Sequence, residues 1–206
     1  MSVPRSVVEQ SGARLSLHGF SDASKKALCA VIYVVATYSD RRISQNLLTS
    51  KARVAPRNLS IPRLELAAAQ ALAKLSSNVI KALSSWSITE TIPWTDSTTV
   101  LHWLADKGTW STFVRKRVKL IKELCNATWR HVPTDQNPSD LGTRRATSTN
   151  LDEFWLKGLT WLGDKKEWPQ QPEVAATTET LTSAESKPAR KTIMLEQDRD
   201  QLNNNE

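Results

Sequence analysis

The fold of this chain is decided by one stretch near the N-terminus, residues 15–51, which reads LSLHGFSDASKKALCAVIYVVATYSDRRISQNLLTSK. Residues 15–21 and the β-branched run at 29–38 predict two strands, and residues 44–51 predict a third after a turn at 39–41. Connections this short favour antiparallel pairing. The stretch therefore predicts a three-stranded antiparallel meander.

Helices and strands alternate after the meander. Ser60-Ile61-Pro62 predicts a helix start, with a capping hydroxyl and a proline in the first turn, and an apolar stripe continues to about Leu83. The remaining expected elements are a strand at 90–95, helices at 97–105 and 109–124, a strand at 127–132 and a helix at 138–145. This order predicts an α/β domain with a five-stranded mixed sheet flanked by helices.

Composition excludes several classes of protein. The chain has 206 residues, of which 39% are hydrophobic and 24% charged, enough for one sizeable core. Two distant cysteines and three histidines exclude a disulfide scaffold and a zinc finger. No apolar run approaches the ~20 residues of a membrane span, and no leader opens the sequence. We therefore expect an intracellular, cytoplasmic protein that is neither secreted nor bound to a membrane.

Charge and aromatic residues divide the chain into two parts. The net charge is +7, yet residues 171–206 hold seven acids against four bases and have no aromatic residue. Such a polar segment cannot bury enough apolar surface to order itself, so residues 170–206 are predicted to form a disordered tail. The basic remainder suits a polyanionic partner.

Glu65 stands where an acid is unexpected. On the helix that begins near residue 61, it shares a stripe with Ala68, Ala69 and Leu72 and therefore points toward the core. A buried carboxylate needs a cation or hydrogen bonds to keep its charge. The alternative is a buried ion pair with an arginine such as Arg53 or Arg63.

Three further acids occur at the ends of predicted elements. Asp22 and Asp96 each end a strand, and Asp140 opens the last helix. Each acid alone is explained equally well as a turn or helix-capping residue. Together with Glu65, however, they could meet at one end of a sheet, where α/β folds place their chemistry. Four carboxylates suit Mg²⁺ or Mn²⁺, and on a basic surface such a site suggests a nuclease.

Five motifs follow one another in a specific order. They are residues 17–24 (LHGFSDAS), 50–56 (SKARVAP), 61–66 (IPRLEL), 94–98 (WTDST) and 129–141 (WRHVPTDQNPSDL). Together they closely resemble the ribonuclease H region of the Pol polyproteins of BEL/Pao-type LTR retrotransposons. The resemblance extends over about residues 4–162.

The resemblance implies a ribonuclease H-like fold and hydrolysis of the RNA strand of RNA–DNA hybrids. It places Asp22, Glu65, Asp96 and Asp140 at the positions of the family's metal ligands, with two Mg²⁺ or Mn²⁺ ions expected alongside substrate. It places His131 in a loop whose histidine is thought to help proton transfer or product release, although a structural role explains His131 equally well. The implied partners, besides the hybrid, are the reverse transcriptase and integrase regions of the parent polyprotein, in virus-like particles.

The chain departs from the family at one motif. Where the family usually reads D-L-A-S-R-G, residues 140–145 read DLGTRR, and Gly142 inside a short helix costs about 1 kcal/mol relative to alanine. One alternative is therefore an inactive nucleic-acid-binding relic with the same fold. An aspartic protease is excluded, because neither Asp22 nor Asp96 is followed by the required Ser/Thr-Gly.

The resemblance and the hydrophobic pattern together divide the chain into four segments. They are an N-terminal connector at 1–14, the ribonuclease H-like domain at 15–147, a Trp-rich C-terminal connector at 148–169 and the tail. In the predicted helix 109–124 an inward stripe includes Phe113, and the outward face carries Arg115, Lys116, Lys119 and Lys122. This face is either ordinary solvated surface or a contact surface for the hybrid's phosphates.

Overall fold

The N-terminal stretch forms the predicted meander. The structure is a computed structural model that describes residues 8, 12–105, 108–144 and 154–172. Strands β1 (Arg14–Ala23), β2 (Ala27–Thr37) and β3 (Ile43–Val54) pair antiparallel in chain order. Strand β2 is buried along nearly its whole length because it lies inside the sheet with both of its faces covered.

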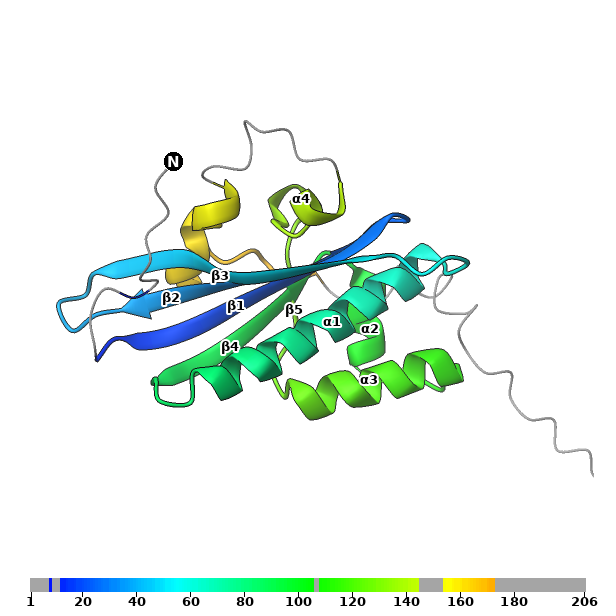
Figure 1. The fold of residues 1–206 in the computed structure, drawn as a ribbon, viewed down its shortest axis with the longest axis horizontal. Helices are drawn as coiled ribbons and strands as arrows, with labels where there is room; N and C mark the ends of the chain where they lie inside the picture. Colours follow the sequence, from blue (N-terminus) through cyan, green and yellow to red (C-terminus); the bar gives the residue numbers. More distant parts are fainter. Residues whose placement is uncertain (1–7, 9–11, 106–107, 145–153, 173–206) are drawn as a thin grey trace, which may run out of the picture.

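Helix α1 (Ile61–Ala82) begins where the sequence predicts and crosses one face of the sheet (Figure 1). Its apolar stripe packs Leu64 and Ala68 against the end of the meander and Leu72 against the middle of it. Ser60 stands at the N-cap with extended backbone, but its hydroxyl makes no capping hydrogen bond. The expected hydroxyl cap is therefore wrong, and the extended Ser60 followed by Pro62 in the first turn marks the start.

Two parallel strands complete the sheet. Strand β4 (Ile88–Thr95) pairs parallel with β1, and β5 (Arg130–His131) pairs parallel with β4 only at Trp94 and Thr95. The sheet order β3-β2-β1-β4-β5 confirms the predicted five-stranded mixed sheet. Strand β5 is shorter than the predicted 127–132, because Ala127 and Trp129 turn toward the helical core instead of continuing along β4.

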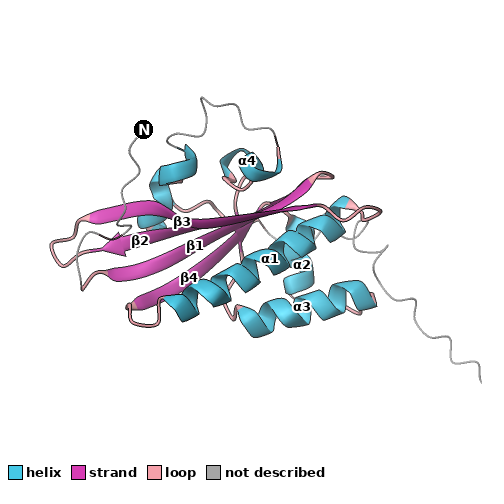
Figure 2. Ribbon diagram, in the orientation of Figure 1, coloured by secondary structure: helices cyan, strands magenta, loops and turns pink. Residues whose placement is uncertain are grey.

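Two further helices cover the same face as α1. Helix α2 (Thr98–Leu104) has Ser97 as its N-cap, and the Ser97 hydroxyl accepts a hydrogen bond from the backbone N–H of Val100. Helix α3 (Thr112–Leu124) is capped in the same way by Ser111, whose hydroxyl accepts a hydrogen bond from the backbone N–H of Val114. Helix α3 therefore starts three residues later than the predicted 109. Figure 2 shows α1, α2 and α3 on one side of the sheet and α4 on the other.

The opposite face of the sheet is covered by the Trp-rich segment. Helix α4 (Asp140–Thr143), η1 (Thr134–Gln136), η3 (Thr160–Gly163) and η4 (Lys165–Glu167) are the short elements of this region. Leu159, Trp161 and Leu162 form one buried cluster with Phe20, Tyr33 and Trp94 of the sheet, and Phe154, Trp155 and Trp168 pack against it. The segment predicted as a Trp-rich connector therefore packs into the core on this face of the sheet.

The ends of the chain lie mostly outside the described residues. At the N-terminal side Ala13 is already buried, directly before β1. At the C-terminal side Gln171 is hydrogen-bonded to His131, so the packed part of the chain reaches into the segment predicted as a tail. Residues 173–206, the rest of that predicted tail, fall outside the description. None of the described helices is long and apolar enough to cross a membrane.

Removing the Trp161 ring is expected to lower the free energy of unfolding by about 3 kcal/mol or more, because Trp161 is 9% exposed and packs on Trp94 with ring centroids 5.0 Å apart. The measurement is urea denaturation of Trp161→Ala. Trp86→Ala is the control, since Trp86 is 37% exposed, and about 1 kcal/mol or less is expected there. An equal decrease in the two variants would contradict the assignment of this segment to the core.

Candidate metal centre

Three carboxylates from three elements meet at one end of the sheet. Asp22 lies near the end of β1, Glu65 in the second turn of α1, and Asp96 directly after β4. One oxygen of each lies within 4.8 Å of the others. The register explains the meeting, because Ser21 and Thr95 are partners in the parallel β1–β4 pair and the two aspartates follow them.

Glu65 carries the highest electrostatic cost in this group. Burial, followed by the charges of Asp22 and Asp96, raises its pKa to about 9, although the backbone N–H of Ala23 partly offsets this. Its Oε2 atom is buried and has no hydrogen-bond partner among the described residues. Within the part of the chain that the structure describes, the expected alternative of an arginine partner is not realised.

The two candidate arginines lie elsewhere. The guanidinium of Arg63 lies over the ring of Phe113, with Cζ 4.9 Å from the centroid. Arg53 is exposed on β3. Among the described residues, Glu65 is therefore a buried acid for which no side chain supplies a compensating cation.

Hydrogen bonds from two loops hold the aspartates. The Thr143 hydroxyl donates to Asp22 Oδ2. Burial and then Asp22 raise the pKa of Asp96, whereas hydrogen bonds from Thr134 and Asn137 act against this rise. Asn137 also donates to the Ser21 carbonyl at 3.0 Å. The loop after β5 is thus tied to the ends of both parallel strands.

Asp140 lies at the margin of the group. It opens α4, and burial followed by the charge of Asp22 raises its pKa, while Arg144 lowers it. Its Oδ1 atom is 2.6 Å from Nε of Arg144, and a quarter of its side chain is exposed. The structure therefore brings Asp140 within electrostatic reach of Asp22, with one oxygen engaged by an arginine.

Gly142 permits the approach of α4 to the sheet. A Cβ atom at this position would overlap the Sγ atom of Cys29 on β2. The residue that weakens the helix by propensity is therefore the one that lets α4 lie on the strand and lets Thr143 reach Asp22. In the sequence, the close approach of Gly142 to Cys29 is indicated only by the departure of residues 140–145 from the family motif.

His131 lies at the end of β5, outside the carboxylate group. Its backbone N–H donates to Gln171 Oε1 at 2.6 Å, and its carbonyl accepts from Gln171 Nε2 at 3.2 Å. The side-chain amide of Gln171 therefore occupies the free edge of β5 as a neighbouring strand would. Sequence analysis missed Gln171, because no local pattern links it to a strand forty residues earlier.

The four predicted phosphate-contacting residues are all exposed on α3. They are Arg115, Lys116, Lys119 and Lys122. One of them, Lys119, lies 3.8 Å from Glu123 on the next turn. Phe113, expected in the inward stripe, is only half-buried and lies at the edge of the α1–α3 contact.

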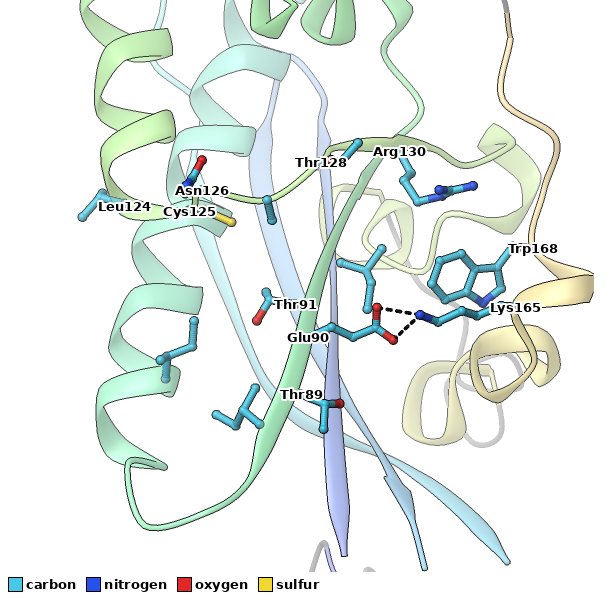
Figure 3. A pocket seen from close by; sticks show the side chains of 14 residues that line it. Thr89, Glu90, Thr91, Leu124, Cys125, Asn126, Thr128, Arg130, Lys165 and Trp168 are labelled. Carbon is cyan, nitrogen blue, oxygen red and sulfur yellow. Dashed lines mark hydrogen bonds and ion pairs between the residues drawn. The ribbon is translucent and has the colours of Figure 1, made fainter. Parts of the chain in front are cut away.

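A large cavity lies away from the carboxylates, along the outer edge of β4 (Figure 3). Its walls include Thr91 of β4, Cys125 after α3, Arg130 and Trp168, and Glu90 is held there by Lys165 at 2.7 Å. None of the three clustered acids lines it. The three acids lie elsewhere, at the end of the sheet, with Asp22 and Glu65 buried and Asp96 half-buried.

Comparison with known protein families gives one match, to the N-terminal part of the chain. Residues 1–97 match the family model of the Pao retrotransposon-like RNaseH-like domain. The family predicted from the motifs is confirmed over these residues. The matched part of the chain contains Asp22, Glu65 and Asp96, whereas His131 and Asp140 lie after it. No curated protein matches the chain.

Solved structures similar to this chain include three of ribonuclease H type. RNase H1 of the halophilic archaeon Halobacterium salinarum is 16% identical, with a TM-score of 0.38 over 61% of this chain and 90% of that one. The N-terminal RNase H domain of Rv2228c from Mycobacterium tuberculosis is 13% identical, with 0.39 over 61% and 86%. LC11-RNase H1, in complex with an RNA/DNA hybrid, is 15% identical, with 0.38 over 60% and 88%.

Glu65 is expected to make folding stability depend on pH. Between its ordinary pKa of 4.5 and about 9 the folded protein keeps a proton that the unfolded chain releases. The free energy of unfolding should therefore fall as pH rises through this window, and Glu65→Gln should flatten the fall. The measurement is denaturation in chelator from about pH 5 to pH 8.5.

Mg²⁺ or Mn²⁺ should oppose this fall, because a bound cation favours the ionised carboxylates. The matched control is Glu123→Gln on the exposed face of α3, which should retain the wild-type pH dependence. A wild-type protein whose stability is constant over the window, or rises, would exclude a buried protonated Glu65.

Proposed function

We propose that this domain is a metal-dependent endonuclease of ribonuclease H type that hydrolyses the RNA strand of RNA–DNA hybrids. The observation that carries the proposal is the group of three buried or half-buried carboxylates within 4.8 Å, one of which has a buried oxygen without a partner among the described residues. Such oxygens suit a hard divalent cation, and Mg²⁺ or Mn²⁺ fits them best. The family match of residues 1–97 supports the same reaction class.

Four carboxylates would hold the metal, two ions being expected with substrate. Asp22, Glu65 and Asp96 would supply the clustered oxygens. Asp140 would supply a fourth ligand, either through the oxygen that Arg144 does not contact or through Oδ1 after the ion pair with Arg144 opens. The chemistry that bound ions would supply here is activation of a water and stabilisation of a leaving oxygen in an in-line displacement. The chain's own contribution is to hold these oxygens at fixed positions through Thr143 and the loop after β5.

His131 is proposed to assist proton transfer or product release. It is half-exposed at the end of β5, whose partner Thr95 directly precedes Asp96. Gln171 holds the backbone of His131 through both its N–H and its carbonyl, and the imidazole is not part of the carboxylate group. The side chain would therefore reach substrate from the margin of the site.

The partners proposed for the domain are the hybrid and the neighbouring regions of a Pol polyprotein, reverse transcriptase and integrase, in the cytoplasm. The exposed cations of α3 would contact backbone phosphates and so recognise shape rather than sequence. The 2′-hydroxyl beside the carboxylates would select RNA as the cleaved strand.

Asp96→Asn is expected to abolish cleavage of a labelled RNA–DNA hybrid without unfolding the protein, because the amide keeps the shape and removes a metal-binding charge. The assay compares Mg²⁺, Mn²⁺ and chelator. The control is Asp135→Asn, which removes an exposed carboxylate from η1 and should cleave like the wild type. Cleavage that persists in chelator or in Asp96→Asn would contradict the proposal, as would a wild type that binds hybrid without cutting it.

Neutralising Lys116, Lys119 and Lys122 together to glutamine should weaken hybrid binding. The slope of log affinity against log salt should flatten by about 0.7–0.9 for each phosphate that the variant no longer neutralises. Turnover at saturating hybrid should change little, because the carboxylates are untouched. The control replaces three exposed lysines elsewhere, Lys74, Lys81 and Lys166. Equal salt slopes in both triple variants would show that the α3 lysines are only solvated surface.

A further inference from the structure

Strand β5 is too short to hold its own position in the sheet. It consists of Arg130 and His131 and pairs with β4 only at Trp94 and Thr95. The backbone N–H of Val132 donates to the Thr95 carbonyl at 3.1 Å and adds one more bond. Strands in globular proteins usually have about five or six residues. The position of β5 therefore depends on its other neighbours.

The last part of the described chain supplies these neighbours. Cζ of Arg130 lies 5.0 Å from the centroid of a Trp168 ring, and the two side chains stand next to each other in Figure 3. Three residues later, the Gln171 amide accepts from the N–H of His131 at 2.6 Å and donates to its carbonyl at 3.2 Å. Nε2 of Gln171 also donates to the Pro169 carbonyl at 2.9 Å. Both donors of this amide are thus engaged, and its orientation toward β5 is set.

The imidazole of His131 is placed by its backbone alone. It makes no hydrogen bond, ion pair or ring contact with the residues that the structure describes. His131 pairs with Thr95, which directly precedes Asp96, so a shift of β5 would move the imidazole relative to the carboxylates. A displacement of about 1 Å can cost a reaction up to about a hundredfold in rate. The residue that holds the backbone of β5 therefore controls the place of the ring.

We propose that Gln171 is a positioning residue for His131, holding β5 as a neighbouring strand would so that the imidazole meets the substrate at a defined place. This inference rests on the proposed function, because the place of the ring matters only in cleavage. Gln171 acts through His131 and is not itself a catalytic residue. The end of the described chain thereby contributes to the site, although none of the four acids lies there.

The test is a double-mutant cycle on cleavage of a labelled RNA–DNA hybrid in Mg²⁺. Gln171→Met keeps the length of the side chain and removes both bonds to His131. It should lower kcat about tenfold with KM nearly unchanged, a size typical of coupling between residues in contact. In the His131→Ala background the same substitution should have no further effect, because the group that it positions is gone. An equal loss of kcat in both backgrounds would overturn the inference.

Gln45 provides a matched control, because its side chain makes bonds of the same kind elsewhere in the fold. Its Nε2 atom donates to the carbonyls of Lys157 and Leu159 at 2.9 and 3.0 Å and so ties β3 to the Trp-rich segment. Gln45→Met should lower the melting temperature as Gln171→Met does, yet leave kcat at the wild-type value. Equal losses of kcat in the two variants would mean that Gln171 only stabilises the fold, and would overturn its positioning role.

Amide hydrogen exchange in chelator tests the contact without any cleavage. In Gln171→Met the His131 amide should exchange about three- to tenfold faster, the effect of one lost hydrogen bond. The Val132 amide is the internal reference and should change less, since it donates to Thr95 within the sheet. An unchanged exchange rate at His131 would contradict the positioning role.

The outcomes separate this inference from the proposed function. A wild type and a Gln171→Met variant that cleave hybrid with the same kcat would support the endonuclease and overturn the positioning role. A wild type that cleaves no hybrid would overturn the endonuclease and, with it, any role of Gln171 in turnover, even where exchange shows the contact with His131.

Discussion

Mutual repulsion among carboxylates is the constraint around which one end of this domain is built. Asp22, Glu65 and Asp96 are brought within 4.8 Å by three separate elements, although their charges disfavour the approach. The parallel β1–β4 register delivers the two aspartates, and the angle at which α1 crosses the sheet delivers Glu65. Thr143, Asn137 and the Ala23 amide hold the group by hydrogen bonds. Packing in the rest of the fold offsets the unfavourable free energy of placing these three acids close together.

Much of that stability comes from the aromatic cluster on the face opposite α1. Trp94 contacts rings from two directions, stacking with Phe20 at 6.1 Å and meeting Trp168 edge-on at 5.3 Å. His18 stacks on Trp94 as well, and burial followed by Lys165 lowers its pKa to about 3, so this imidazole is neutral and acts as another flat ring. Trp94 stands two residues before Asp96. The cluster therefore fixes the strand that carries one of the acids.

Sequence reasoning recovers the elements whose signals are local. Alternation in residues 15–51 and the stripe of α1 are properties of short windows, so the meander and the main helix were predicted nearly to their ends. Asp22 and Asp96 were found because each ends a predicted strand, and Glu65 because it lies on the apolar stripe of a predicted helix. The motifs that stand in register supported all three. The packing of the Trp-rich segment was not predicted, since its short turns have no period and its partners, among them Phe20, Tyr33 and Trp94, lie on strands far from it in the sequence. The contact of Arg63 with Phe113 and the contact of Gln171 with His131 were missed for the same reason, because both join elements that are distant in the sequence.

The Trp-rich segment that covers the sheet face opposite α1 determines the shortest fragment of this chain that can be expressed alone or fused to another protein. A cut after the last acid-bearing motif would leave Phe20, Tyr33 and Trp94 facing water, a contiguous apolar surface prone to self-association. A chimera or expression fragment therefore has to carry the chain through Trp168, and the Gln171 contact with β5 favours including a few residues more. A fragment chosen only to include the acid-bearing motifs would lack the Trp-rich segment that packs against the strands of Asp22 and Asp96.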